Sequence, residues 1–299
     1  MYERFFLEGT AATKYDVFKY LNEHGDKSIT VAQIAKALRS SYSKAQHATE
    51  LMTSDLQSLQ HRLGNEQAAQ ASDFRVISAN IAPEDYRYFL LLESPTFRFY
   101  DQVFQGENVS MAAFAKDQGV SVSTMRRKIE PFREYLVSQG VVLDIRNWSL
   151  SGNELAIRIF LESLYTDLYN GKTWPLRRVD EAQVTRLCAS LHEWSEYKHF
   201  QQTSFVTSRE RIVLGLQIMR INCGHFFTPS SAFNVIHSHQ IPEIPIFSDT
   251  NFPQLAPHQL SAESKYAIFN SVSRLNYSAQ DTELQPTFAA SLNGKRIPL

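Results

Sequence analysis

The sequence predicts a mostly α-helical fold, and three observations favour it. Over most of the first 220 residues, apolar residues recur at spacings of three and four, whereas alternating stretches are few and short. Hydrophobic residues make up 43% of the 299 residues, enough for a sizeable core in each of two or three domains. Several of the 11 glycines fall between the periodic runs, where they favour turns.

Charge and cysteine content exclude several classes of protein. Lys and Arg total 30 against 31 Asp and Glu, so the formal net charge is -1 and any surface that attracts nucleic acid must be local. The two cysteines, Cys188 and Cys223, exclude a disulfide scaffold and fit a reducing cytoplasm. The start of the chain carries acids where a secretory signal needs basic residues, and the longest uncharged stretch is interrupted by polar residues. We therefore expect a soluble, cytoplasmic protein without a membrane span.

The first domain, residues 1–70, is predicted to contain a helix-turn-helix unit. A short helix is followed by a turn over residues 39–43 and by a longer helix. Lys44, Gln46 and His47 remain exposed at the start of the longer helix, where a Gln can pair with adenine through two hydrogen bonds. The expected buried positions of the two helices are Ile34, Ala35 and Leu38, then Ala45, Ala48, Met52, Leu56 and Leu59.

The second domain, residues 71–152, repeats this order of parts. Residues 109–124 resemble residues 29–44, because in each a Ser or Thr cap precedes a short helix, a tight turn follows, and a second cap opens a longer helix. Gly119 permits the sharp turn, and Ser121 or Ser123 supplies the second cap. The expected buried positions are Ala112, Ala113, Phe114 and Ala115, Val120 between the helices, and Met125, Ile129, Phe132 and Leu136.

A basic triplet opens the second of these helices. Arg126, Arg127 and Lys128 lie off the apolar stripe, on the helix that a helix-turn-helix inserts into the major groove. An ordinary solvated helix face is the alternative interpretation. Two β-prone runs then flank Arg146 and predict a hairpin, which would make this unit a winged helix-turn-helix. The candidate phosphate contacts are Ser121, Ser123, Thr124 and Arg146.

Residues from about 80 to 175 carry a wider pattern. It comprises the run YRYFLLLES from Tyr86, the run VSVSTMRR from Val120 and the run LSGNELAIRIF from Leu150, with Phe97 and Phe104 between the first two. It continues through Trp174-Pro-Leu and is weaker over residues 1–70. This pattern resembles the Mga/AtxA family of Gram-positive transcriptional regulators.

The resemblance implies an N-terminal helix-turn-helix, a winged helix-turn-helix and helical domains similar to the sugar-phosphotransferase regulation domain. Its implied partners are double-stranded promoter DNA, a second copy of the chain in a homodimer, and a phosphocarrier protein of the sugar phosphotransferase system. Family members usually continue through a second regulation domain and a small α/β domain. By this comparison the chain corresponds to a natural short form or to a truncated one.

Residues 153–299 are predicted to form a helical bundle regulatory domain. We expect helices opened by Asn153 and by Ser208, and a final helix from about residue 261 to 275. In phosphotransferase-regulated relatives a histidine of such a domain accepts a phosphoryl group, and His192 and His199 are the candidates here. On one helix they would be about 10.5 Å apart, which suits separate roles. Ordinary surface histidines are the alternative.

A metal site and an enzyme are further alternatives. Cys223, His225, His237 and His239 are plausible zinc ligands, but their spacing fits no known finger. The sequence has no glycine-rich phosphate loop, nucleophile elbow or His-Glu-x-x-His motif, so we expect neither an enzyme nor a cofactor. The hypothesis is a DNA-binding transcriptional regulator with tandem helix-turn-helix and winged helix-turn-helix domains. A protein-interaction module without DNA binding is the alternative.

Overall fold

The computed structural model describes residues 2–24, 29–107, 109–169, 173–193, 204–229 and 247–272. Its described residues are mostly helical, and the strands that it assigns form one two-stranded sheet, which confirms the predicted fold class. The chain divides into two compact units. Unit 1 comprises residues 1–151 and 167–170, and unit 2 comprises residues 152–166 and 171–299.

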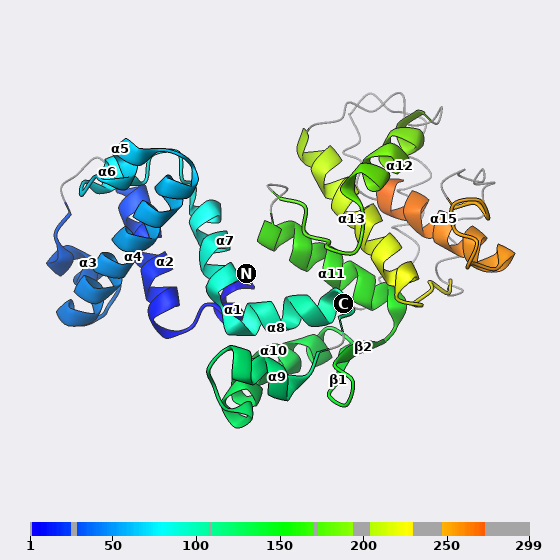
Figure 1. Ribbon diagram of the computed structural model, residues 1–299, viewed down its shortest axis with the longest axis horizontal. Coiled ribbons are helices and arrows are strands. Elements are labelled where there is room, and N and C mark those ends of the chain that lie inside the picture. Colours follow the sequence, from blue (N-terminus) through cyan, green and yellow to red (C-terminus); the bar gives the residue numbers. More distant parts are fainter. Residues whose placement is uncertain are drawn as a thin grey trace, which may run out of the picture. The chain divides into compact units, whose positions relative to one another are not determined.

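Unit 1 contains both segments for which a helix-turn-helix is predicted (Figure 1). Its elements are α1 (Glu3–Phe6), α2 (Gly9–Glu23), α3 (Val31–Ala37), α4 (Tyr42–Arg62), α5 (Glu66–Ala69), α6 (Phe74–Ile77), α7 (Pro83–Glu93), α8 (Pro95–Phe104), α9 (Met111–Asp117), α10 (Val122–Ser138), β1 (Val141–Asp144) and β2 (Ser149–Gly152). Helix α3 packs beside α4, and α9 packs beside α10.

Helix α4 is held by both small and polar residues. Ala45 and Ala48 are buried where α3 and α2 approach α4, and Met52 and Leu56 continue the buried stripe, as predicted. Asp55 accepts hydrogen bonds from Lys14 Nζ on α2 and from the Tyr86 hydroxyl on α7, the latter at 2.8 Å. These contacts fix α4 against two neighbouring helices.

An aromatic cluster holds α10. The Phe132 ring lies 4.7 Å from the Phe6 ring and 4.8 Å from the Tyr100 ring. The Tyr100 hydroxyl also donates a 2.7 Å hydrogen bond to the carbonyl oxygen of Ile129. The predicted stripe of α10 is buried throughout, although Pro131 lies inside the helix and removes one backbone donor.

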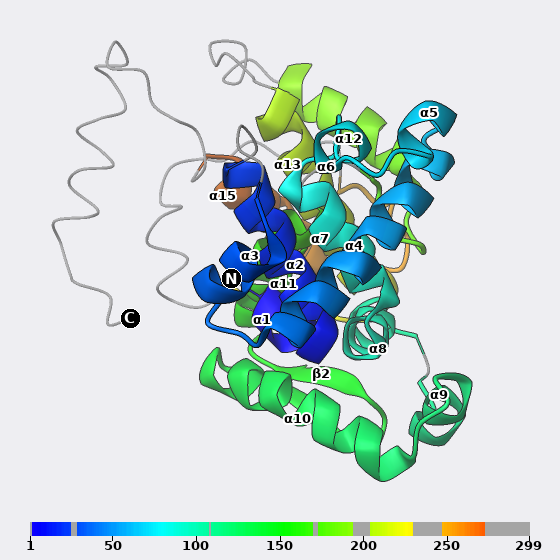
Figure 2. The same ribbon diagram turned by 90° about the vertical axis from the view of Figure 1, so that its left-hand side faces the viewer.

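The predicted hairpin follows α10. Strands β1 and β2 pair with each other, and β1 packs against α10. In Figure 2 the label of β2 marks this hairpin above α10. Trp148 at the end of the turn has a φ of 52°, and its buried ring lies 5.0 Å from that of Phe99 on α8. Val141 and Leu150 are buried as well, so the hairpin is anchored on the core by one face.

The described part of unit 2 contains α11 (Glu154–Tyr169, with its last turn in unit 1), α12 (Glu181–Glu193), α13 (Ser204–Asn222) and α15 (Pro257–Val272). Asn153 opens α11 as predicted, because its side chain accepts from the amide groups of Leu155 and Ala156. Two helices begin earlier than predicted. Helix α13 begins at Ser204 rather than Ser208, and α15 begins at Pro257 rather than near residue 261. Proline at a first helical position lacks a donor that the helix does not use there.

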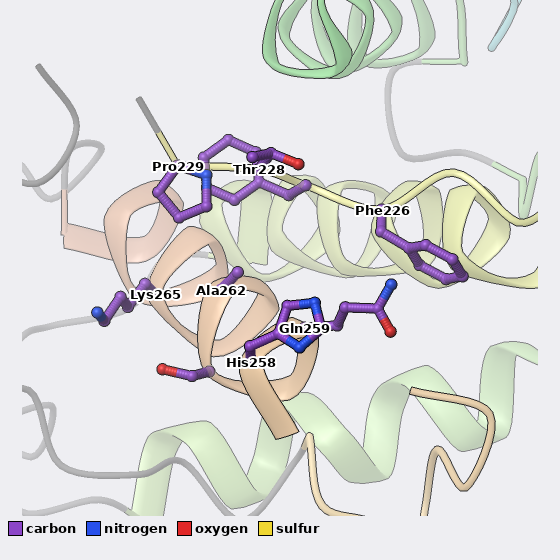
Figure 3. A pocket seen from close by; sticks show the side chains of 9 residues that line it. Phe226, Thr228, Pro229, His258, Gln259, Ala262 and Lys265 are labelled. Atoms are coloured by element: carbon purple, nitrogen blue, oxygen red, sulfur yellow. The ribbon is translucent and has the colours of Figure 1, made fainter. Parts of the chain in front are cut away.

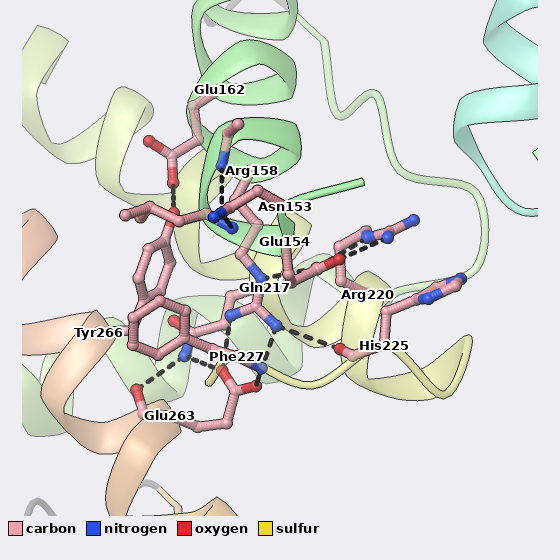
Figure 4. A network of polar contacts seen from close by, with 12 residues as sticks. Asn153, Glu154, Arg158, Glu162, Gln217, Arg220, His225, Phe227, Glu263 and Tyr266 are labelled. Carbon is pink, nitrogen blue, oxygen red and sulfur yellow. Dashed lines mark hydrogen bonds and ion pairs between the residues drawn. The ribbon is translucent and has the colours of Figure 1, made fainter. Parts of the chain in front are cut away.

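A buried ionic network joins α11, α13 and α15 (Figure 4). Arg158 has a side chain that is 1% exposed, and it forms two hydrogen bonds of 2.6 and 2.9 Å with Glu263, which is 0% exposed. Glu154 bridges Arg158 and Arg220. Gln217 and the Phe227 amide also donate to Glu263, so both charges are paired and hydrogen-bonded.

Candidate nucleic-acid interface

The two predicted helix-turn-helix units share one register, because their caps and turns recur 80 residues apart. Thr30 caps α3 and Ser110 caps α9, each by accepting from the amide three residues on. Ser41 caps α4 and Ser121 caps α10 in the same way, with hydrogen bonds of 3.3 and 3.1 Å. Of the two predicted caps for α10, Ser121 is therefore the one used.

The turns of the two units are also equivalent. The amide of Ser40 donates to the Ala35 carbonyl at 2.9 Å, and the amide of Val120 donates to the Ala115 carbonyl at 3.0 Å. The preceding residue has a positive φ in both, 50° at Arg39 and 65° at Gly119. Glycine adopts this conformation without the Cβ clash that a residue such as Arg39 must tolerate. The predicted turn over residues 39–43 was too long, because α4 begins at Tyr42.

Parts of the predicted core were wrong. Leu38 and Leu59 are half-buried rather than buried, and the buried face of α9 differs from the prediction. Ala112 and Ala113 are exposed, whereas Met111, Phe114 and Ala115 are buried. In a helix of seven residues only one narrow face can reach the core, and the run of small residues gave no signal of which face that is. Val120 between the helices is half-buried.

The two α10 arginines predicted to contact DNA are exposed. The structure describes no side-chain hydrogen bond or ion pair for Arg126 or Arg127 with the rest of the described chain. Both lie in the first two turns of α10. Cations so placed, on the second helix of the unit, can approach phosphates or guanine edges.

The third cation of the triplet is engaged. Lys128 Nζ lies 2.6 Å from Glu8 Oε2, and the side chains are 32% and 43% exposed. Glu8 immediately precedes α2, far from α10 in the sequence, and local pattern reasoning missed it. A phosphate would therefore have to compete with a carboxylate for Lys128.

The first predicted helix-turn-helix unit presents a more neutral face on α4. Lys44, Gln46 and His47 are exposed on α4, as predicted. Gln46 donates a 3.0 Å hydrogen bond to Glu50 one turn later, which leaves the Gln46 carbonyl oxygen outside that bond. Arg39 in the turn is a further exposed cation, which was not predicted to contact DNA.

The predicted phosphate contacts lie beside the basic face. The Ser121 hydroxyl lies 2.9 Å from that of Ser123 and 2.8 Å from that of Thr124, at the start of α10. Arg146 is exposed in the hairpin turn, where its amide donates to Asp144. Contact of any of these residues with DNA stays a prediction.

The candidate residues of unit 2 are only partly described. His199, His237 and His239 lie outside the described residues, as does the side chain of His192. Burial and the nearby charge of Arg220 lower the pKa of His225. Within the described ranges, no group of three or more His, Cys, Asp or Glu side chains is arranged to hold a metal ion.

A hollow of about 370 Å³ opens beside the start of α15 (Figure 3). Phe226, Thr228 and Pro229 line it from the segment after α13, and His258, Gln259 and Lys265 line it from α15. The lining residues include no carboxylate or thiol. Across the described helices, none combines the length and hydrophobicity needed to cross a membrane.

Comparison with known proteins agrees with the geometry of the second helix-turn-helix unit, which contains α9 and α10. Residues 83–165 match the Mga helix-turn-helix domain, a segment that contains α9, α10 and the hairpin. The capsule synthesis positive regulator AcpB of Bacillus anthracis is 26% identical over 106 residues. That match covers 36% of this chain and about a fifth, 22%, of the length of AcpB. The two matches confirm the resemblance to Mga/AtxA-like regulators.

Proposed function

We propose that this chain is a DNA-binding transcriptional regulator of the Mga/AtxA type, without enzymatic activity. Two helix-turn-helix units, in domains 1–70 and 71–152, bind double-stranded promoter DNA, and residues 153–299 regulate that binding. The observation that carries the proposal is the exposure of Arg126 and Arg127 on the second helix of a helix-turn-helix.

Several features support this assignment of the surface. The stripe of α10 is buried, which turns Arg126 and Arg127 outward on a helix fixed by the Phe132 cluster. A rigid support matters, because base recognition needs side chains held in a defined register. The β1–β2 hairpin adds Arg146 as a wing contact to the phosphate backbone.

Selection of bound duplexes from a random pool, followed by binding measurements at several salt concentrations, tests the proposal. We expect enrichment of a consensus sequence and an affinity that falls steeply with salt, because bound cations release counterions. The Arg126→Ala/Arg127→Ala variant should flatten the slope of log K against log salt by about 0.9 for each phosphate that the variant no longer neutralises.

Arg133→Ala is the matched control. Arg133 lies on the same helix, and it is paired with Glu130 at 2.7 Å. Arg133→Ala removes one positive charge, as each substitution of the double variant does. It should leave the slope of log K against log salt nearly unchanged. Absence of binding by the unmodified protein at low salt would contradict the proposal and favour a protein-interaction module.

The regulatory part of the proposal concerns unit 2. A homodimer would place two copies of the interface on one promoter, and a phosphocarrier protein would phosphorylate His192 or His199. A phosphoryl group adds a charge near −2 and can reorganise a helix interface. Incubation with a phosphorylated carrier, followed by mass spectrometry of His192→Ala and His199→Ala variants, tests this step. Absence of a phosphoryl adduct on the unmodified protein would contradict it.

A further inference from the structure

The first residue of the second helix is an exposed apolar side chain in both helix-turn-helix units. Tyr42 is 56% exposed at the start of α4, and Val122 is 37% exposed at the start of α10. Each directly follows the capping serine, Ser41 or Ser121. Isolated exposed apolar residues are common on proteins, but these two occupy the same position of a repeated unit. The repetition indicates a shared use.

Each of these apolar residues has a polar neighbour one turn later. Arg126 is four residues after Val122, and Gln46 is four residues after Tyr42, so each pair shares a helix face. The residues between them on the core side are buried, Met125 in α10 and Ala45 in α4. Both helices therefore present an apolar group next to a side chain that can form two hydrogen bonds with a base.

The edges of bases in the major groove offer matching chemistry. Arg pairs with the two acceptors of guanine and Gln pairs with adenine, whereas the only apolar group on that surface is the C5-methyl group of thymine. A valine gains nothing from a phosphate oxygen, because it has no donor and no charge. A thymine methyl group is therefore the base feature that fits Val122 beside Arg126.

We propose that Val122 and Tyr42 are specificity-determining residues that contact thymine C5-methyl groups in the major groove. This inference rests on the proposed DNA binding and adds the class of base that each unit recognises. The second helix-turn-helix unit contacts thymine through Val122, near a guanine that Arg126 recognises. By the shared register, the first helix-turn-helix unit contacts thymine through the ring of Tyr42, near an adenine read by Gln46.

Replacement of thymine by uracil tests the proposal, because uracil keeps every hydrogen-bonding group and lacks only the methyl group. In a duplex obtained by selection, each thymine is replaced singly and affinity is measured by fluorescence anisotropy. For the unmodified protein we expect about a fourfold loss of affinity at each contacted position, the factor that corresponds to burial of one methylene-sized group. Val122→Ala should reduce the loss at its own position, because alanine offers a smaller apolar surface to the methyl group, and Tyr42→Ala should do so at a different position.

Val137→Ala is the matched control, since Val137 is 57% exposed on the same helix but lies near its other end. It should respond to uracil as the unmodified protein does. The inference is overturned if the unmodified protein binds the selected duplex and tolerates uracil at every position, or if Val122→Ala retains the full uracil effect. In both cases DNA binding itself would stand. Failure of the unmodified protein to bind any duplex would instead refute the proposed function.

Discussion

Lys128 Nζ lies 2.6 Å from Glu8 Oε2, so a carboxylate just before α2 is paired with a cation near the start of α10. Both side chains are partly exposed, and such pairs contribute little to stability. Their effect on an anionic ligand is larger, because the pair removes one cation from the surface and places a negative charge beside it. We expect the pair to lower the affinity for DNA.

Glu8→Gln should therefore strengthen DNA binding. We expect about a two- to fivefold gain at low salt, the range of an exposed ion pair, and a salt slope steeper by about 0.9 if Lys128 then binds a phosphate. Anisotropy titrations at several salt concentrations measure both. Glu134→Gln removes the same charge from an exposed position farther along α10 and serves as the control. Equal behaviour of the two variants would show that only net charge matters.

Arg146→Ala tests the hairpin as a wing. If Arg146 binds a phosphate, its removal should flatten the salt slope by about 0.9 and leave the selected consensus unchanged, since phosphate contacts carry no sequence information. Binding titrations and a repeated selection measure these two effects. Asn147→Ala, at the next exposed position of the turn, is the control. A changed consensus would mean that Arg146 contacts bases.

Gly215→Ala should destabilise unit 2. A Cβ at this position of α13 would lie 2.6 Å from Leu176 Cδ1 and 2.6 Å from a Trp174 ring carbon. Alanine is otherwise favoured over glycine in a helix, so a loss of stability can be attributed to this overlap. We expect a loss of about 1–3 kcal/mol in the free energy of unfolding, measured by urea denaturation. Unchanged or increased stability would refute the close packing.

Glu263→Gln should be strongly destabilising. It leaves the buried guanidinium of Arg158 without its main counter-charge, a change that costs about 3–5 kcal/mol in the free energy of unfolding. Arg158→Met/Glu263→Met removes both charges, and we expect it to be more stable than Glu263→Gln. Urea denaturation of the two variants decides this. If the double variant is the less stable one, the ionic pair does more than neutralise buried charge.

Glu154 makes the stability of unit 2 dependent on pH. Burial alone would raise the pKa of Glu154, but the hydrogen bonds and charges of Arg220 and Arg158 outweigh it and hold that pKa below the ordinary 4.5. A carboxylate whose pKa is lower in the folded state stabilises the fold at pH values above its pKa in the unfolded state. This stabilisation disappears as the pH falls through the pKa of the folded state. The stability gap between the unmodified protein and Glu154→Gln should thus narrow below about pH 4.5. A gap that stays constant with pH would contradict this.

Local patterns in the sequence predicted much of unit 1. The spacing of Met125, Ile129, Phe132 and Leu136 was sufficient to orient α10, because only one helix face can bury all four. The correspondence of residues 29–44 with residues 109–124 predicted the register that the caps and turns now show. The exposure of Arg126 and Arg127 followed from the same spacing.

Contacts between distant residues could not be predicted in this way. Glu8 and Lys128 are separated by 120 residues, and Arg158 and Glu263 by 105. A charged residue inside an apolar helix such as α11 gives no sign of its partner, since the periodic pattern reports only which face is buried. Ala112 and Ala113 were misplaced for a related reason, because alanine is accommodated on either face of a short helix.

The matching register of α4 and α10 makes their outward faces interchangeable. The distance from capping serine to Gln46 and His47 equals the distance to Arg126 and Arg127, and the supporting residues behind them are buried alike. Exchange of these side chains between the two helices would move a recognition surface while the scaffold stays the same. The protein thus carries two predicted recognition helices on equivalent scaffolds. The base preference of one can change without a change in the other.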